Sequence, residues 1–310
     1  MARGRGPPEE RSLDQLREFG VVNLDKPPGP SAHQVAGWLR DALGVEKAAH
    51  AGTLDPKVTG CLPVLTGTAT RIAQAFLEGT KEYVAVLELH GPAPTDIEAV
   101  VGEFEGEIYQ KPPRKSAVSR RLRTRRIHAL DLLEVRDRKA LLRIRCESGT
   151  YVRKLCHDVG LALGTGAHMG HLRRTATDPF DDVDLRSMHD LVDAIAFAEE
   201  GDEGPLRETL RPAERALAHL PRVTIAPSAA REVGEGAQVY APGVIGLREP
   251  SRRSGADRNA SGDDDAGDAP GEEPLVACYT PDGAAVCLGR LVGDPDADSG
   301  RVVALERVLV

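Results

Sequence analysis

Long hydrophobic runs are missing from this 310-residue sequence, and their absence excludes one large class of proteins. No stretch approaches the roughly 18 apolar residues that span a bilayer, and residues 1–11 are polar. We therefore expect a cytoplasmic chain with no membrane-spanning helix and no signal peptide. With 41% hydrophobic and 28% charged residues, the composition is ordinary for a globular protein and excludes wholesale disorder.

Cysteine is also scarce, and its five residues never take the Cys-x-x-Cys spacing. This argues against a disulfide framework and a cysteine zinc site, so we expect buried apolar cysteines. His168 and His171 offer a metal-binding alternative, but no carboxylate motif accompanies them. Clustered carboxylates for two-metal chemistry are missing too, so neither a metal nor a redox cofactor is predicted.

A net positive charge, which nucleic-acid binding usually needs, is missing as well, because the formal net charge is -8. The distribution of charge matters more than the sum. Residues 251–273 are rich in acidic and small residues without hydrophobic periodicity, as expected of a solvated surface insertion. Between Lys111 and Arg126, in contrast, there are eight basic residues and no acidic one, which predicts a local polyanion site. An acidic surface around a basic stripe also fits a high-salt cytoplasm.

Hydrophobic periodicity predicts a mixed α+β chain. Residues 19–24 form an expected strand, and a helix capped by Ser31 follows, with Trp38 on its core face. A strand is expected at 81–89, and Thr95 with Glu98 forms a capping-box pattern for a short helix. The remaining expected elements are a hairpin of strands 127–135 and 140–146, helices at 152–163, 185–198 and 206–218, and strands at 223–226, 238–241, 275–279, 285–292 and 302–310.

These patterns predict two domains. After an N-terminal extension of residues 1–18, residues 19–220 form the larger, mixed domain. Residues 221–310 form a β-rich module that carries the acidic insertion 251–273.

One segment, HAGTLDPKVTGCLPV at residues 50–64, places Asp55 in a loop punctuated by glycine and proline. Such loops hold a side chain at the mouth of a rigid scaffold. Taken alone, Asp55 would more often be a turn residue, so the rest of the sequence decides its role.

The segment closely resembles the catalytic loop of the TruB and dyskerin branch of the pseudouridine synthases. Four further segments resemble the motifs of that family, in order and spacing: VVNLDKPPGPS at 21–31, KEY at 81–83, GTYVR at 149–153 and GAHMGHLRR at 166–174. Departures are small, with Ala51 where relatives often have serine and Lys154 where many have threonine.

By this resemblance Asp55 is the catalytic aspartate, Tyr83 stacks on the extruded uracil, and Arg153 pairs with the Asp55 carboxylate. The other residues assigned to substrate binding are Tyr151, Leu172 and Lys26. Without the motif context, Tyr83 would equally well be a strand residue packed in the core, and Arg153 a surface ion-pair residue.

The chemistry agrees with these roles. Moving a glycosidic bond from nitrogen to carbon requires a flipped base, a closed pocket and a carboxylate that acts as nucleophile or base. An aromatic platform recovers part of the flipping cost by stacking. Because residues two apart share a face only in an extended chain, we expect residues 149–153 to be extended so that Tyr151 and Arg153 act together.

The basic run, with KPPRKSAV at 111–118, resembles the archaeal and eukaryotic form of the family. Its alternative is a solvated charge cluster. The residues assigned to the RNA backbone are Lys111, Arg114, Lys115, Arg120, Arg121 and Arg123. The module after residue 221 is similar to a PUA domain. The implied fold is α+β, a catalytic domain with a mixed, mainly antiparallel sheet followed by a small β-barrel-like PUA domain.

Three functions remain open at this point. The leading one is an RNA pseudouridine synthase. It would act either alone on the TΨC arm of tRNA or as the catalytic subunit of a box H/ACA ribonucleoprotein. In that particle a guide RNA and small protein subunits direct the enzyme to rRNA. The form of the loop and the basic run favour the guided role with residual tRNA activity. A non-catalytic RNA-binding or ribosome-assembly protein is the second, opposed by the joint presence of Asp55, Tyr83, Tyr151 and Arg153. Metal-dependent RNA hydrolysis is the third, and it lacks carboxylates.

Overall fold

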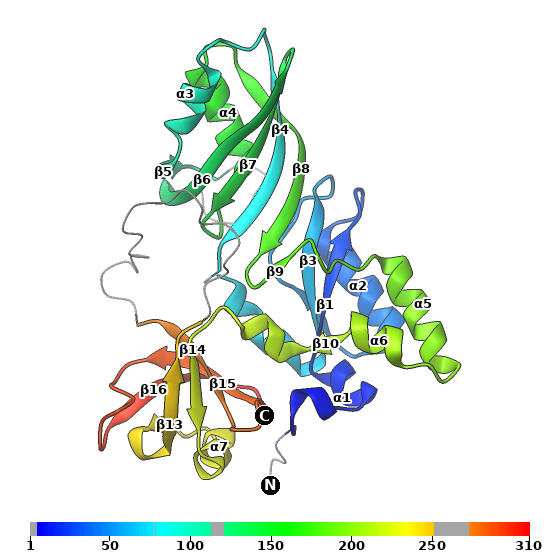
Figure 1. Cartoon of the computed structure of the whole chain (residues 1–310), viewed down its shortest axis with the longest axis vertical. Helices are drawn as coiled ribbons and strands as arrows, with labels where there is room; N and C mark the ends of the chain where they lie inside the picture. The colour runs from blue at the N-terminus through cyan, green and yellow to red at the C-terminus, as the bar shows by residue number, and fades with distance from the viewer. Residues whose placement is uncertain (1–4, 78, 113–120, 251–272) are drawn as a thin grey trace. The chain divides into compact units, whose positions relative to one another are not determined.

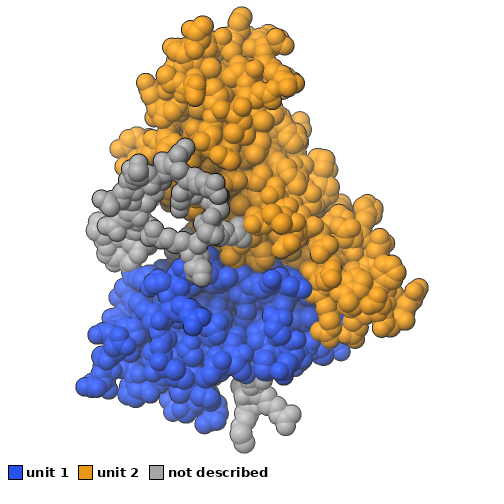
Figure 2. All heavy atoms as spheres, viewed as in Figure 1, with its two compact units in different colours: residues 1–21, 65–75, 210–310 blue, residues 22–64, 76–209 orange. Residues whose placement is uncertain are grey.

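A computed structural model describes residues 5–77, 79–112, 121–250 and 273–310. The chain divides into two compact units (Figure 2): unit 1 comprises residues 1–21, 65–75 and 210–310, and unit 2 comprises residues 22–64 and 76–209. The division of the chain into domains at residues 19 and 221 stays a prediction. Within the described residues, no helix has the length and apolar character needed to cross a membrane.

Unit 2 is built on the larger sheet (Figure 1). Its strands, in spatial order, are β1 (Gly20–Lys26), β3 (Thr59–Thr66), β8 (Ala167–Thr177), β4 (Lys81–Leu89), β7 (Lys139–Cys146), β6 (Arg123–Arg136) and β5 (Gly106–Gln110). Two short strands lie beside this path, where β2 (Ala48–His50) pairs with β3 and β9 (Phe180–Asp181) pairs with β8. The β3–β8 pair is parallel, while the β8–β4, β4–β7, β7–β6 and β6–β5 pairs are antiparallel. The prediction of a mixed, mainly antiparallel sheet is therefore confirmed.

Strand β4 shows how the sequence pattern forms this sheet. Alternate residues, starting at Lys81 and including Tyr83, are buried on one face, and the residues between them are half-buried. That alternation is what a strand with one fully covered face requires. The predicted hairpin of β6 and β7 is also present, and it turns at Asp137, whose φ of 50° lies in the left-handed region that Asp tolerates better than most residues.

Five helices are described in unit 2, and two of them begin with a strong capping signal. The five are α2 (Ala32–Leu43), α3 (Ile97–Gly102), α4 (Val152–Ala162), α5 (Met188–Glu199) and α6 (Gly204–Thr209). Ser31 and Ser187 each accept a hydrogen bond from a backbone N–H three residues on, in a complete capping box. Helix α4 packs on β8 and α3 packs on β6 (Figure 1).

The prediction that Trp38 lies in the core is wrong. Its side chain is 50% exposed, because the buried stripe of α2 follows Val35, Ala36, Leu39 and Leu43. Trp38 lies beside that stripe, three residues from Val35 on the edge that faces solvent.

The predicted capping box of Thr95 and Glu98 is also wrong, although the short helix exists. Helix α3 has Asp96 at its N-cap, and no side-chain cap hydrogen bond forms. The helix therefore begins one residue later than the pattern requires.

The single helix predicted over residues 206–218 is wrong too. The chain forms α6, then β10 (Arg211–Pro212), then the 3-10 helix η3 (Ala213–Leu217). Pro212 has no N–H for a helical hydrogen bond, and β10 instead pairs antiparallel with the first residues of β1.

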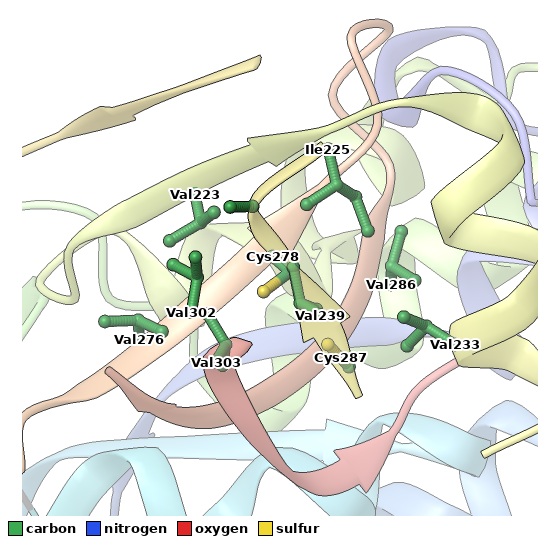
Figure 3. Close-up of a cluster of buried hydrophobic side chains, with 11 residues drawn as sticks. Val223, Ile225, Val233, Val239, Val276, Cys278, Val286, Cys287, Val302 and Val303 are labelled. Carbon is green, nitrogen blue, oxygen red and sulfur yellow. The ribbon is translucent and has the colours of Figure 1, made fainter. Parts of the chain in front are cut away.

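Unit 1 contains a second sheet of six strands. In spatial order they are β12 (Val239–Tyr240), β16 (Arg301–Val308), β15 (Ala285–Leu291), β14 (Leu275–Tyr279), β11 (Arg222–Ile225) and β13 (Val244–Arg248). The five predicted strands are confirmed, whereas β13 and α7 (Pro227–Gly234) were not expected. Figure 3 shows the core, in which valines from the strands and from α7 surround Cys278 and Cys287. All five cysteines are buried and free, as predicted.

The first residues of unit 1 are tied to this module by a buried ion pair. Arg11 is 2% exposed, and its Nη2 donates to Glu214 Oε1 at 2.6 Å. The same carboxylate oxygen accepts the backbone N–H of Ala285, on β15, at 3.1 Å. Helix α1 (Leu13–Glu18) follows directly, with a capping box at Ser12. Burial of the pair is tolerated because the carboxylate has partners from two segments.

Candidate active site

Asp55 lies in the loop between β2 and β3. A turn closes where the Val58 N–H donates to the Asp55 carbonyl at 2.9 Å, and the Ala51 N–H donates to Pro63 O at 2.8 Å. The Asp55 side chain is 52% exposed, so this carboxylate is held on a rigid loop and is open to solvent. The loop was predicted from its glycine and proline framing.

Lys26 holds this loop through hydrogen bonds to backbone carbonyls. Its side chain is fully buried, and Nζ donates to the carbonyls of Pro27, Pro56 and Val58 at 2.9, 3.0 and 2.8 Å. The Gly29 N–H adds a second bond to Pro56 O at 2.9 Å. Burial lowers the pKa of the Lys26 ammonium. All three N–H donors of the ammonium are therefore used on backbone carbonyls of the Lys26 segment and the Asp55 loop, and the assignment of Lys26 to substrate binding stays a prediction.

Arg153 forms an ion pair and a hydrogen bond with Asp55 through Nη2 and Oδ2. The predicted pairing of these two residues is present, although the expected backbone is not. Residue 153 lies in the first turn of α4, after the extended N-cap residue Tyr151, and Gly149 has a left-handed φ of 81°. The guanidinium reaches the loop because a side chain at the start of a helix points outward past the helix terminus.

The other residues assigned to the base pocket lie on neighbouring strands. Tyr83, on β4, is 8% exposed, and Leu172, on β8, is 7% exposed. Leu172 stands opposite Ala85 of β4, two residues from Tyr83 on the same face. Burial raises the pKa of the Tyr83 hydroxyl, and the positive charge of Arg174 acts in the opposite direction.

Gln110 connects the basic segment to this site. It is 2% exposed at the end of β5, and its side chain accepts the Tyr151 N–H at 2.9 Å and donates to the Tyr151 carbonyl at 3.2 Å. Of the assigned RNA-backbone residues, Lys111 and Arg121 are exposed and Arg123, on β6, is half-buried. Arg114, Lys115 and Arg120 lie outside the described residues.

Two further polar residues of the motif segments, His50 and Arg174, carry buried nitrogen atoms close to the Asp55 loop and have no role assigned from the sequence. Burial lowers the pKa of His50, whose Nδ1 is buried and has no hydrogen-bond partner among the described residues. Arg174 is 1% exposed, contacts the loop at Ala51 O and is the strand partner of Tyr83. Both residues stand inside the quoted segments, but nothing in those segments distinguishes a buried polar group from an exposed one.

His168 and His171, the metal alternative, are both exposed. His168 Nδ1 lies 3.0 Å from His90 Nε2, and His168 Nε2 lies 3.4 Å from the Glu88 carboxylate. Within the part of the chain that the structure describes, no three His, Cys, Asp or Glu side chains gather as metal ligands.

Comparison with known proteins places this loop in a family. A profile described as "TruB family pseudouridylate synthase (N terminal domain)" matches residues 40–152, and one described as "tRNA pseudouridylate synthase B C-terminal domain" matches residues 153–218. A DKCLD (NUC011) domain profile matches residues 3–36. A relative from Haloarcula marismortui, named "Probable tRNA pseudouridine synthase B", is 68% identical over 307 residues, which are 99% of this chain and 93% of the relative. The chain belongs to the TruB family of pseudouridine synthases.

Solved structures agree with that membership. This TruB-family chain is 43% identical to a protein in the "Crystal Structure of a Cbf5-Nop10-Gar1 Complex", with a TM-score of 0.88 over 100% of this chain and 91% of the other. It is 41% identical, with a TM-score of 0.85 and the same coverage, to a protein in the "Structure of H/ACA RNP bound to a substrate RNA containing 2'-deoxyuridine". The predicted family, fold class and enzyme class, an isomerase acting on RNA, are confirmed.

Proposed function

We propose that this enzyme converts uridine to pseudouridine with Asp55 as its catalytic carboxylate. The observation that carries the proposal is the ion pair between Asp55, on the loop after β2, and Arg153, in the first turn of α4, with both side chains about half exposed. A half-exposed carboxylate is accessible to an extruded nucleotide, and the guanidinium orients it.

In the reaction the bond between uracil N1 and the sugar C1′ breaks, and a bond between uracil C5 and C1′ forms. The proton on C5 leaves to solvent and N1 takes up a proton from solvent, so atoms balance and no further reactant is consumed. Asp55 acts at the sugar as nucleophile or base. Tyr83, Tyr151 and Leu172 are assigned to hold the detached uracil while it rotates, and the bound RNA has to cover the half-exposed Asp55 so that water is excluded.

For the substrate we favour rRNA positioned by a guide RNA, with residual activity on the TΨC arm of tRNA. The whole-chain similarity to proteins solved with Nop10, Gar1 and a substrate RNA supports small protein partners of the box H/ACA type. The name of the Haloarcula marismortui relative supports tRNA as a substrate. We assign residues 221–310 to a PUA domain, the basic run to the RNA backbone, and the enzyme to the cytoplasm.

The Asp55→Asn variant tests the catalytic assignment. The change is nearly isosteric and removes only the ionised oxygen, so tritium release from [5-³H]uridine RNA should fall to background while filter-binding affinity stays within about threefold. Asp41→Asn, at an exposed site on α2, is the control and should keep wild-type activity. Turnover by Asp55→Asn would refute the assignment. An inactive wild-type chain that binds RNA would favour the alternative of a non-catalytic RNA-binding protein.

The substrate is tested by mapping pseudouridine in two reactions. One contains a tRNA transcript alone, and the other contains guide RNA, an rRNA fragment and the small protein partners. We expect efficient modification of the guided uridine and slow modification of tRNA. If only tRNA is modified and guide and partners change nothing, the guided role is wrong.

A further inference from the structure

Arg174 is a buried arginine to which the proposed reaction assigns no role. It lies on β8 and is 1% exposed. Among the described residues, no carboxylate forms an ion pair with its guanidinium. Burying a guanidinium costs free energy unless its N–H donors have acceptors, so the acceptors of Arg174 indicate which segments it holds in place.

The guanidinium contacts two separate parts of the site and lies on the same face as a third. Nε donates to Cys61 O, on β3, at 2.7 Å, and Nη2 makes a long contact of 3.5 Å with Ala51 O in the Asp55 loop. Arg174 is also the strand partner of Tyr83, and its positive charge opposes the rise that burial causes in the pKa of the Tyr83 hydroxyl. One planar group therefore links β3 to the loop, on the face of the tyrosine assigned to stack on uracil.

The strand register brings these contacts together. Arg174 is the direct partner of Tyr83 across the β4–β8 pair and of Gly60 across the β3–β8 pair. Partners on neighbouring strands point to the same face, so the guanidinium and the phenol meet at one level of the sheet. A φ of +99° at Gly60, where an added Cβ would lie 2.2 Å from Arg174 O, shows how closely β3 approaches.

We propose that Arg174 is a positioning residue that sets the Tyr83 ring and the Asp55 loop relative to each other. This inference rests on the proposed function. The N–H donors of a guanidinium lie in one plane at fixed angles, so they can hold two partners at a fixed relative position, which a lysine ammonium cannot do. A stacking ring that rotates about its buried end would misplace the detached uracil, and a displacement of about 1 Å can lower a rate by roughly 100-fold.

A double-mutant cycle separates this role from general support of the fold. Arg174→Lys keeps the charge but loses the fork, and Tyr83→Phe removes only the hydroxyl. Each change should lower the single-turnover rate by about 10- to 100-fold, the range for an interaction between a polar and a charged group, while KM for RNA stays within about threefold. The double variant should lose much less than the product of the two single losses, because both changes remove the same interaction between the guanidinium and the hydroxyl.

Arg173→Lys is the matched control. Arg173 is adjacent on β8, and its guanidinium donates to the Asp25 carboxylate at 3.0 and 3.1 Å. Combined with Tyr83→Phe, it should give losses that multiply. If the Arg174 pair also multiplies, or if Arg174→Lys raises KM at unchanged rate, the positioning role is overturned.

Two measurements keep the test decisive. Thermal melts of Arg174→Lys and Arg174→Gln identify the variant that stays folded at the assay temperature, and the cycle uses that variant. Tyr83→Phe leaves the backbone contacts of Arg174 in place, so wild-type turnover by Tyr83→Phe would overturn the proposal even if no Arg174 variant folds. Wild-type turnover that disappears in Asp55→Asn supports the proposed function independently of either result.

Discussion

Replacing Lys26 by methionine should destabilise unit 2 and impair the Asp55 loop. The substitution roughly keeps the volume of the side chain but leaves the carbonyls of Pro27, Pro56 and Val58 without their shared donor. Only the bond to Val58 O is fully buried, and Pro56 O keeps the Gly29 N–H as a donor. The largest part of the loss therefore comes from Val58 O, since a buried acceptor without a partner costs about 1 to 3 kcal/mol.

The loss is partly offset because methionine carries no ammonium that must be stripped of water, and burial lowers the pKa of the Lys26 ammonium. The three lost bonds and this offset together give a net loss of about 3 kcal/mol in the free energy of unfolding. Against a typical total of about 5 to 15 kcal/mol, that is a large fraction. For a chain of this size the melting temperature should fall by about 5 to 10 °C.

The assay is thermal unfolding followed by circular dichroism, together with the tritium-release rate at a temperature where both proteins remain folded. Lys57→Met is the control, because Lys57 is exposed in the same loop, and its effect should stay within about 0.5 kcal/mol. Lys26→Met should also turn over more slowly than the control, since Asp55 lies next to Pro56. A Lys26→Met protein that melts within about 1 °C of wild type would show that the three bonds do not hold the loop.

Three further predictions concern other parts of unit 2. Burial lowers the pKa of Lys81 to about 8, so between pH 8 and 10.5 the unfolded chain holds a proton that the folded chain has released, and stability from this group rises with pH. The free energy of unfolding of wild type relative to Lys81→Met should therefore increase by about 1.4 kcal/mol per pH unit in denaturant titrations between pH 8 and 10, and a constant difference would contradict this. Gly60→Ala should lower the free energy of unfolding by about 2 kcal/mol or more in the same titrations. The reason is that the new Cβ would lie 2.2 Å from Arg174 O, at a residue whose φ is +99°. A melting temperature equal to that of wild type would refute the close approach. Ser31→Ala should cost about 1 kcal/mol by removing the α2 cap, and Ser31→Asp should restore most of that loss in melting experiments.

The sequence predicted the structure best where the residue type and its neighbours in the sequence are compatible with a single local conformation. Asp55 between glycine and proline predicted an exposed carboxylate on a loop, and the period-two pattern of residues 81–89 predicted β4 residue for residue. Trp38 was misplaced because a helical pattern defines a stripe only to within one position, and the edge of the stripe depends on what packs against it.

Buried polar groups were the least predictable. Lys26 and Arg174 look like surface cations in a sequence, and only the tertiary structure shows that backbone carbonyls satisfy them. The expected extension through Arg153 failed for a similar reason, since a long side chain reaches Asp55 from a helix as well as from a strand. Motif resemblance identified these residues but carried no information on their burial.

The pairing of Arg11 with Glu214 has a practical consequence for preparing the enzyme. Removing residues 1–11 would remove the Arg11 guanidinium. The Glu214 carboxylate would then be buried beside the Ala285 N–H with its charge uncompensated. Unit 1 would lose stability although no residue of its second sheet had changed. Truncated versions should therefore begin before Gly6, whose carbonyl also accepts from Arg11, and an affinity tag is better separated from this end by a flexible spacer.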